Sequence, residues 1–368
     1  MAGVGTRQRV RSLDGLRAVA VVAVMIYHLK VPHLLPGGYI GVDVFFVISG
    51  YLITSLLMKE SDEHAGLVSL RRFYARRALR LFPALGAAAA LALALSPLTD
   101  ASTTHETVTG IGWVAIYVGN WARAVDPNAL GTLGHTWSLA IEEQFYLVWP
   151  AVFVVLDRTG VARARLAQAL IVLAVLEMSY RELLARDGAS LARIYFGTDT
   201  HCAGLLVGCA VAYWLASQAR PTPLEPRPLA IATWGGAAAL VALLVLANDG
   251  LRSSVATYPA VTVASAALLV GLVGRGAPRL ERLLGSRPAV WVGRRSYGLY
   301  LWHYVVYFAL PWHAAATTAV GELAMVAVSF AVAALSYRFV ELPALRVKRR
   351  FRPGPPVQLS TVVGTGLP

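Results

Sequence analysis

The sequence predicts an all-α integral-membrane protein with about ten transmembrane helices. Of its 368 residues, 57% are hydrophobic and only 14% are charged, whereas a soluble globular domain usually carries about 25% charged residues. Apolar segments long enough to cross a bilayer recur along almost the whole chain. We therefore expect one membrane domain over residues 1–345, followed by a basic and then flexible cytoplasmic tail over residues 346–368.

Ten apolar segments are expected to span the membrane. They are residues 13–30, 38–58, 81–98, 139–156, 166–180, 197–218, 229–247, 256–274, 296–313 and 318–340. The first follows Arg7, Arg9 and Arg11 and so resembles a signal peptide, but it keeps polar residues and lacks a small-residue cleavage site. We interpret it as a permanent span.

An eleventh segment, residues 108–122, is short and contains three glycines and Asn120, which favours a re-entrant or interfacial segment. With ten spans, all but six of the 33 Lys and Arg residues lie on the side of both termini. The six exceptions are Lys30, Arg123, Arg181, Arg186, Arg193 and Arg252. The positive-inside rule then predicts that both termini are cytoplasmic, in a bacterial inner membrane.

The net charge of +13 does not indicate a nucleic-acid partner, because the basic residues lie in short loops between apolar segments. The bilayer explains them better. The two cysteines, Cys202 and Cys209, lie within one apolar segment, where core packing is the expected role.

Arg17 and His28 are two strongly polar residues on the first apolar segment, LDGLRAVAVVAVMIYHL. Eleven residues make almost three helical turns, so both side chains share one helix face, about 16 Å apart along its axis. Such residues inside a membrane helix indicate a functional site. The alternative is an arginine that reaches the inner interface and a histidine that is hydrogen-bonded at the outer one.

The predicted orientation places the polar residues at two levels. The outer level holds His28, Asp43, Glu142, Glu143, Asp199 and His201; the inner level holds Asp14, Arg17, Arg77, Arg80, Arg338 and Glu341. Guanidinium groups suit the phosphates of an anionic ligand. Imidazoles and carboxylates transfer protons near neutral pH.

Each candidate also has a structural explanation. Arg77 and Arg80 are spaced i, i+3 and point the same way, yet they could belong to a basic loop that contacts lipid headgroups. Glu142 and Glu143 point about 100° apart, so we expect only one of them to face a cavity. Glu341 could pair with Arg338 at i, i+3.

His303 lies near the middle of its segment, within an aromatic run that is typical of packing or of an interface belt. The histidines are scattered and form no metal-ligand spacing, so we expect no metal.

Six motifs together resemble the integral-membrane acyltransferase 3 family over nearly the whole chain. They are RSLDGLRAVAVVAVMIYH, GGYIGVDVFFVISGYLIT, RRFYARRALRLFPAL, HTWSLAIEEQFYLVWP, SYGLYLWHYVV and RFVELP, in the family's order. The resemblance implies transfer of an acyl group from acyl-coenzyme A, most simply acetyl-coenzyme A, to a hydroxyl of a glycan or of a glycosylated natural product such as a macrolide.

This resemblance suggests a role for each candidate. Arg17, Arg77 and Arg80 would hold the coenzyme A end, and His28 would act as the general base, because a neutral alcohol is a poor nucleophile. Glu142 would orient His28, with Asp43 as a competitor for that role. Glu143, Asp199, His201, His303 and Glu341 are secondary candidates.

One position departs from the family pattern. In FGTDTHCAGLLVGCAVA, His201 stands where the family commonly has an arginine, so a switchable imidazole replaces a permanent cation. Two other classes of function remain open. A transporter of a small anionic or lipid-linked solute would also carry buried polar residues, and a lipid-binding scaffold would leave His28 replaceable.

Overall fold

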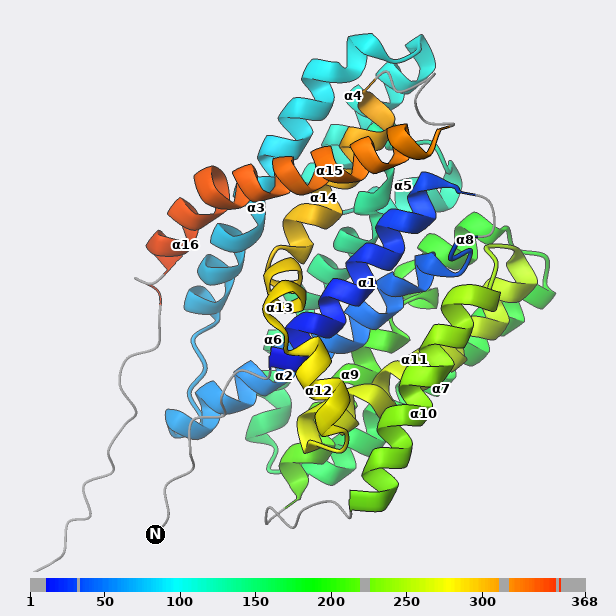
Figure 1. The fold of residues 1–368 in the computed structure, drawn as a ribbon. Coiled ribbons are helices and arrows are strands. Elements are labelled where there is room, and N and C mark those ends of the chain that lie inside the picture. The colour runs from blue at the N-terminus through cyan, green and yellow to red at the C-terminus, as the bar shows by residue number, and fades with distance from the viewer. Residues whose placement is uncertain (1–10, 32–33, 219–225, 311–317, 349–350, 352–368) are drawn as a thin grey trace, which may run out of the picture.

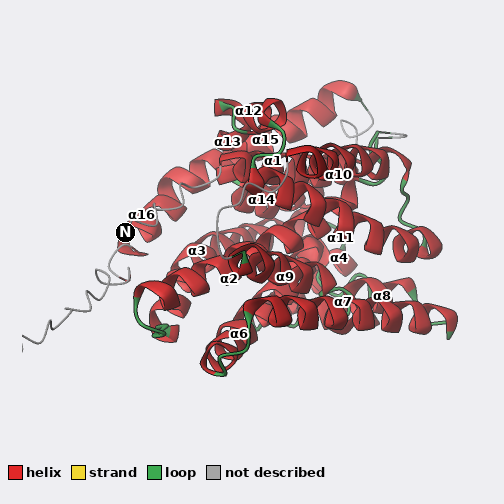
Figure 2. Ribbon diagram, turned by 90° about the horizontal axis from the view of Figure 1, so that it is seen from below, coloured by secondary structure: helices red, strands yellow, loops and turns green. Residues whose placement is uncertain are grey.

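The computed structural model describes residues 11–31, 34–218, 226–310, 318–348 and 351, and these residues form helices and turns without a strand (Figures 1 and 2). The predicted all-α class is thereby confirmed. The first half of the chain contains α1 (Arg11–Leu29), α2 (Gly41–Glu63), α3 (Leu70–Leu95), α4 (Ala101–Ala115), α5 (Gly119–Val125), α6 (Trp137–Arg158) and α7 (Arg163–Arg186). The second half contains α8 (Leu191–Phe196), α9 (Ala203–Ser217), α10 (Pro226–Leu246), α11 (Leu251–Gly274), α12 (Pro278–Leu284), α13 (Arg287–Arg294), α14 (Ser296–Ala309), α15 (Ala319–Ser336) and α16 (Leu342–Lys348).

Seven helices of the described chain are long and apolar enough to cross a membrane. They cover Arg11–Leu29, Gly38–Glu63, Leu70–Leu98, Gly131–Arg158, Arg227–Leu246, Ser253–Gly274 and Ala319–Val347. Seven of the ten expected spans fall on them, whereas the expected spans at 166–180, 197–218 and 296–313 fall on α7, α9 and α14, which do not qualify. A count of ten spans is therefore not confirmed, and the cytoplasmic location of both termini stays a prediction.

The ambiguous segment 108–122 is a broken helix. α4 ends at Ala115, Tyr117 adopts a left-handed backbone with φ of 55°, and α5 begins at Gly119. Neither piece is long enough to cross a membrane, which agrees with the prediction that this segment does not span. The expected tail at 346–368 lies mostly outside the described residues, and its first three residues complete α16.

α1 and α2 form the centre of the molecule, and the largest share of their residues is buried within it. α1 lies in the middle of the bundle and packs against α2, α13 and α14, while α10 and α11 lie side by side beyond it (Figure 1). α2 packs closely along α9. Gly50 of α2 lies against the Leu205 backbone, and Gly208 of α9 lies against the Val47 backbone, at distances that leave no room for a Cβ atom. This close approach brings His201, which lies just before α9, next to Asp43 of α2.

The start of α6 meets α14 through the turn Gly131–Thr136. The Tyr300 hydroxyl of α14 donates a hydrogen bond to the His135 backbone carbonyl, 2.7 Å away. The Arg123 guanidinium of α5 donates to the Gly134 carbonyl at 2.9 Å. These bonds fix the turn against α5 and against α14, the helix that carries His303.

Candidate active site

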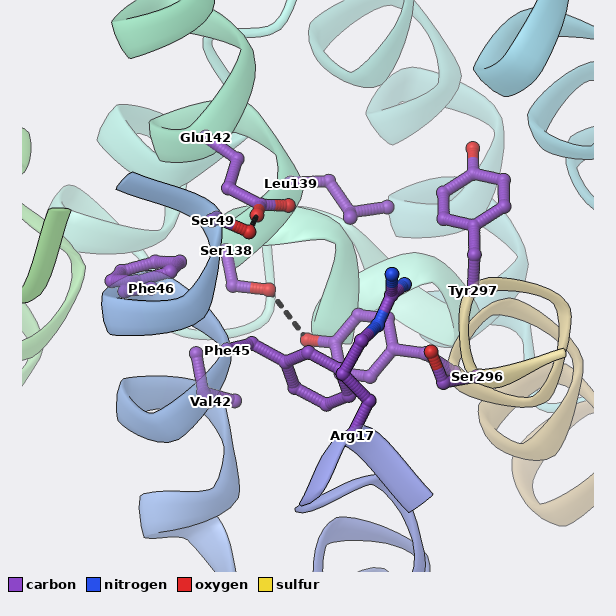
Figure 3. A pocket seen from close by; sticks show the side chains of 11 residues that line it. Arg17, Val42, Phe45, Phe46, Ser49, Ser138, Leu139, Glu142, Ser296 and Tyr297 are labelled. Carbon is purple, nitrogen blue, oxygen red and sulfur yellow. Dashed lines mark hydrogen bonds between the residues drawn. The ribbon is translucent and has the colours of Figure 1, made fainter. Parts of the chain in front are cut away.

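A cavity of about 60 Å³ lies between α1, α2, α6 and α14 (Figure 3). Its walls are formed by Arg17, Val42, Phe45, Phe46, Ser49, Ser138, Leu139, Glu142, Ser296, Tyr297 and Tyr300. Arg17 projects into it, and its guanidinium carbon lies 5.9 Å from the centroid of the Phe45 ring. The Arg17 Nε is buried and has no hydrogen-bond partner among the described residues. A cavity with an unsatisfied cationic donor suits an anionic or strongly polar ligand.

Arg80 of α3 increases the positive charge near this cavity. The guanidinium groups of Arg17 and Arg80 are close enough to interact electrostatically, and they repel each other as like charges. Carboxylates offset part of this repulsion, because Glu142 and Asp14 attract Arg17 and Glu341 attracts Arg80. Arg17 and Arg80, which the sequence assigned to one ligand, are thus brought together.

The two neighbouring glutamates point in different directions, as the helix geometry predicts. Glu142 faces the cavity and accepts hydrogen bonds from the Ser49 and Tyr146 hydroxyls. Glu143 instead pairs with Arg77, with 2.6 Å between Oε1 and Nη2 and 2.9 Å between Oε1 and Nε. The Arg77 guanidinium also lies 3.2 Å from the centroid of the Tyr146 ring.

These contacts require a correction to the two predicted levels. Glu142 and Glu143 belong with Arg17 and Arg77, not with His28, because α6 carries them away from the turn that meets the histidine side chains. The expectation that Glu142 or Asp43 orients His28 finds no contact in the described residues. Both carboxylates are engaged elsewhere.

His28 is hydrogen-bonded to His303, with 3.1 Å between Nδ1 of His28 and Nε2 of His303. The other nitrogen of His303, Nδ1, lies 3.0 Å from the Leu299 carbonyl oxygen. A carbonyl only accepts, so His303 Nδ1 carries the hydrogen. In neutral His303 the lone pair is then on Nε2, and His28 donates to it from Nδ1. This tautomer leaves the lone pair of His28 on Nε2. A general base accepts a proton at such an unprotonated nitrogen.

Tyr300 joins the arginine cavity to the histidine side chains. Its hydroxyl lies 2.6 Å from the Ser138 hydroxyl, and both residues line the cavity. The centroid of the Tyr300 ring lies 5.8 Å from that of the His303 ring and 5.3 Å from that of the His135 ring. The cavity and the histidines therefore share one wall.

Asp43 and His201 form a separate buried pair between α2 and α9. His201 Nε2 lies 2.9 Å from Asp43 Oδ1, and His201 Nδ1 lies 2.7 Å from the Tyr195 carbonyl oxygen. Both side chains are almost fully buried. The imidazole at position 201 is therefore accommodated by the Asp43 carboxylate.

Asp199 accepts two hydrogen bonds from the Arg193 guanidinium, at 2.6 Å to Oδ2 and 2.9 Å to Oδ1. The hydrogen bonds that Arg193 donates to this carboxylate raise the pKa of Arg193. The pair closes the loop before α9, and the structure does not bring Asp199 to His28.

Glu341 is buried in a π-helical turn, Tyr337–Glu341, against Gly298 of α14. It interacts electrostatically with Arg80 and Arg295. The expected pairing with Arg338 is wrong, because the π-turn leaves Arg338 exposed while Glu341 faces inward.

Within the described part of the chain, no group of three or more His, Cys, Asp or Glu residues has the geometry to hold a metal ion. Of the three neighbouring imidazoles, His28 and His303 are hydrogen-bonded to each other, and His135 meets the His303 ring edge-on.

The fold and the two neighbouring clusters define a polytopic helical membrane protein in which the Tyr300 ring lies between a charged cavity and an imidazole pair. The family model described as "Acyltransferase domain", that of the acyltransferase 3 family, matches residues 10–338. The chain therefore belongs to this family, as the six motifs predicted.

Curated relatives share this region. The peptidoglycan O-acetyltransferase OatA of Listeria monocytogenes is 33% identical over 364 residues, which is 92% of this chain and 56% of the relative. The putative peptidoglycan O-acetyltransferase YrhL of Bacillus subtilis is 36% identical over 347 residues, or 90% of this chain and 54% of the relative. A putative O-acetyltransferase of Staphylococcus aureus is 33% identical over 347 residues, with 90% and 56% covered.

The chain thus spans about half the length of the curated relatives it matches. No solved structure matches it.

Sequence reasoning missed two residues of this site. His135 opens the motif HTWSLAIEEQFY, and its place directly before α6 was the available signal. Tyr300 was counted within an aromatic run, because spacing alone does not separate a packing tyrosine from one that links two polar clusters.

Proposed function

We propose that this chain transfers an acetyl group from acetyl-coenzyme A to a sugar hydroxyl of a cell-envelope glycan, with peptidoglycan as the first acceptor to test. The observation that carries the proposal is the continuity of the two clusters. Arg17 and Arg80 repel each other beside a narrow cavity, Tyr300 forms the far wall of that cavity, and His303 with His28 lies behind the wall.

The arginine cavity and the histidines suit the two ends of acetyl-coenzyme A. Phosphates would bind the guanidinium groups of Arg17 and Arg80 through charge-assisted hydrogen bonds. Arg77 already has a carboxylate and an aromatic ring as partners, so we assign it to holding α3 against α6. A long thin pantetheine arm would pass along the cavity and bring the thioester toward the histidines.

His28 Nε2 would take the proton of the acceptor hydroxyl while its oxygen attacks the thioester carbonyl. The oxygen–carbon bond forms, the carbon–sulfur bond breaks, and the proton passes from His28 to the departing thiolate. His303 accepts the His28 Nδ1 hydrogen throughout and so keeps the ring in the required orientation.

The acceptor class rests on the relatives, two of which carry peptidoglycan O-acetyltransferase in their names. The predicted sidedness, with the arginines cytoplasmic and His28 near the outer face, fits a cytoplasmic donor and an envelope acceptor. A glycosylated small molecule such as a macrolide is the alternative acceptor.

The test is transfer of radiolabelled acetyl from acetyl-coenzyme A by the purified full-length chain to peptidoglycan fragments and, separately, to a macrolide. We expect label on the glycan, and a loss of about 10²- to 10⁴-fold in rate with His28→Ala. His105→Ala, at an exposed histidine of α4, is the matched control and should keep the wild-type rate.

Each contrary result points elsewhere. Label on the macrolide alone would replace the acceptor class. A wild-type rate in His28→Ala would contradict the assignment of His28 as the general base. Binding and flux of a solute across vesicles, without any transfer of label, would establish the transporter alternative.

A further inference from the structure

His135 is a buried imidazole whose ring nitrogens make no hydrogen bond of ordinary geometry. It is 1% exposed, and among the described residues only the Leu301 backbone carbonyl interacts with its ring as an acceptor, outside that geometry. Leaving a buried donor and a buried acceptor unpaired is costly, so a structure that does so at one residue invites an explanation.

The ring belongs to the cluster around His28. It stacks on the Tyr304 ring at 4.6 Å and 22°, and it meets the His303 ring edge-on at 5.6 Å, both between centroids. It also interacts electrostatically with His28. An unpaired imidazole thus lies beside the pair that we assign to catalysis.

The ring is held in place by contacts that do not use its nitrogens. Tyr300 donates to the His135 backbone carbonyl, Arg123 donates to the neighbouring Gly134 carbonyl, and Tyr304 stacks on the ring. Its orientation is therefore fixed while its ring nitrogens make no hydrogen bond of ordinary geometry. A preorganised donor of this kind costs no reorganisation when charge develops nearby.

We propose that His135 is a second catalytic imidazole, which donates a ring N–H to the thioester carbonyl oxygen and stabilises the oxyanion formed on attack. The inference rests on the proposed function. An imidazole carries at least one N–H in either protonation state. His135 also immediately precedes the N-terminal end of α6, where the helix dipole favours negative charge.

The assignment adds no proton to the reaction. The carbonyl π electrons move to the oxygen as the hydroxyl attacks, and they return as the carbon–sulfur bond breaks. His28 carries the hydroxyl proton to the thiolate, and His135 gives only a hydrogen bond.

The experiment compares the wild-type full-length chain with His135→Phe and His135→Asn in the acetyl-transfer assay and in thermal unfolding. We expect His135→Phe to lower kcat about 10²- to 10³-fold, the cost of removing one oxyanion donor, and to change KM for acetyl-coenzyme A less than threefold. The unfolding temperature should stay the same or rise, because phenylalanine needs no hydrogen-bond partner. His135→Asn restores a donor and should recover part of kcat.

Ser265→Ala is the control, because it also removes a buried unpartnered polar group, on α11, and it should leave kcat unchanged. A kcat of His135→Phe within threefold of wild type would overturn the inference alone. So would a loss of kcat that accompanies a lower unfolding temperature in both variants, since that result defines a structural residue. If the wild-type chain transfers no acetyl group, the proposed function fails and the oxyanion role fails with it.

Discussion

The tautomer of His28 is set by a backbone carbonyl that His28 never touches. The Leu299 carbonyl fixes the hydrogen of His303 on Nδ1, and His303 then accepts from Nδ1 of His28. A neutral imidazole thus does the orienting that a carboxylate does in many hydrolases. It does so without placing a negative charge in the apolar interior, which would be costly.

His303→Phe should therefore separate the orienting role from simple packing. The variant removes the Nε2 acceptor that His303 offers to the Nδ1 hydrogen of His28, and we expect kcat to fall about 10- to 100-fold with KM for the donor nearly unchanged. His303→Gln keeps an acceptor oxygen and should lose less. Steady-state kinetics of both variants make the test, and equal losses in Gln and Phe would contradict the orienting role.

At this scale the sequence identified residues more reliably than partners. Arg17 and His28 were found because they interrupt an apolar segment. The partner of His28 was expected to be Glu142 or Asp43 but is His303, 275 positions away. No local sequence pattern predicts a contact between residues so far apart in the chain. The packing of α14 against α1 brings the two histidines together.

At the scale of elements, the Arg77–Glu143 pair ties α3 to α6. Both side chains are mostly buried, with 19% and 14% exposed, so solvent screens the pair weakly. The guanidinium also lies over the Tyr146 ring. The motif that suggested ligand binding thus also holds two helices of the site together.

A double-mutant cycle over Arg77→Ala and Glu143→Ala should give a coupling free energy of about 1–3 kcal/mol in unfolding. Removing either partner alone leaves the other charge buried and unpaired. The stability losses of the two single variants should therefore add up to more than the loss of the double variant. The exposed pair Arg186–Glu182, with 74% and 43% exposed, is the control and should couple by about 0.3–0.5 kcal/mol. Equal coupling in the two pairs would contradict a buried link.

Hydrophobic segments predicted seven of the helices well because length and composition suffice for a helix that faces lipid. They were less informative for α7, which is long but polar in places. Glu177 accepts from the Cys202 backbone N–H, and Arg181 donates to the Ile194 and Thr200 carbonyls. Glu177 and Arg181 lower the mean hydropathy of α7, but both are buried and neither charge faces lipid.

At the scale of the whole molecule, α7 decides the sidedness of everything after it. Its 24 residues extend about 36 Å, which exceeds the roughly 30 Å of a bilayer core. Its outward-facing residues include Ile171, Val172, Leu173, Val175 and Leu176, all exposed and apolar, whereas Glu177 and Arg181 face inward. A helix with this division of polarity is expected to cross the membrane although its composition alone does not qualify it.

Cysteine labelling at the two ends of α7 tests this directly. In a chain carrying Cys202→Ser and Cys209→Ser, we place single cysteines at Thr159 and Asp187, two exposed positions that flank the helix. If α7 crosses, an impermeant maleimide added to right-side-out vesicles should label Asp187→Cys and reach Thr159→Cys only after permeabilisation. Labelling of both from outside would place both ends of α7 on one side. It would also reverse the predicted sidedness of α9 and of every later helix.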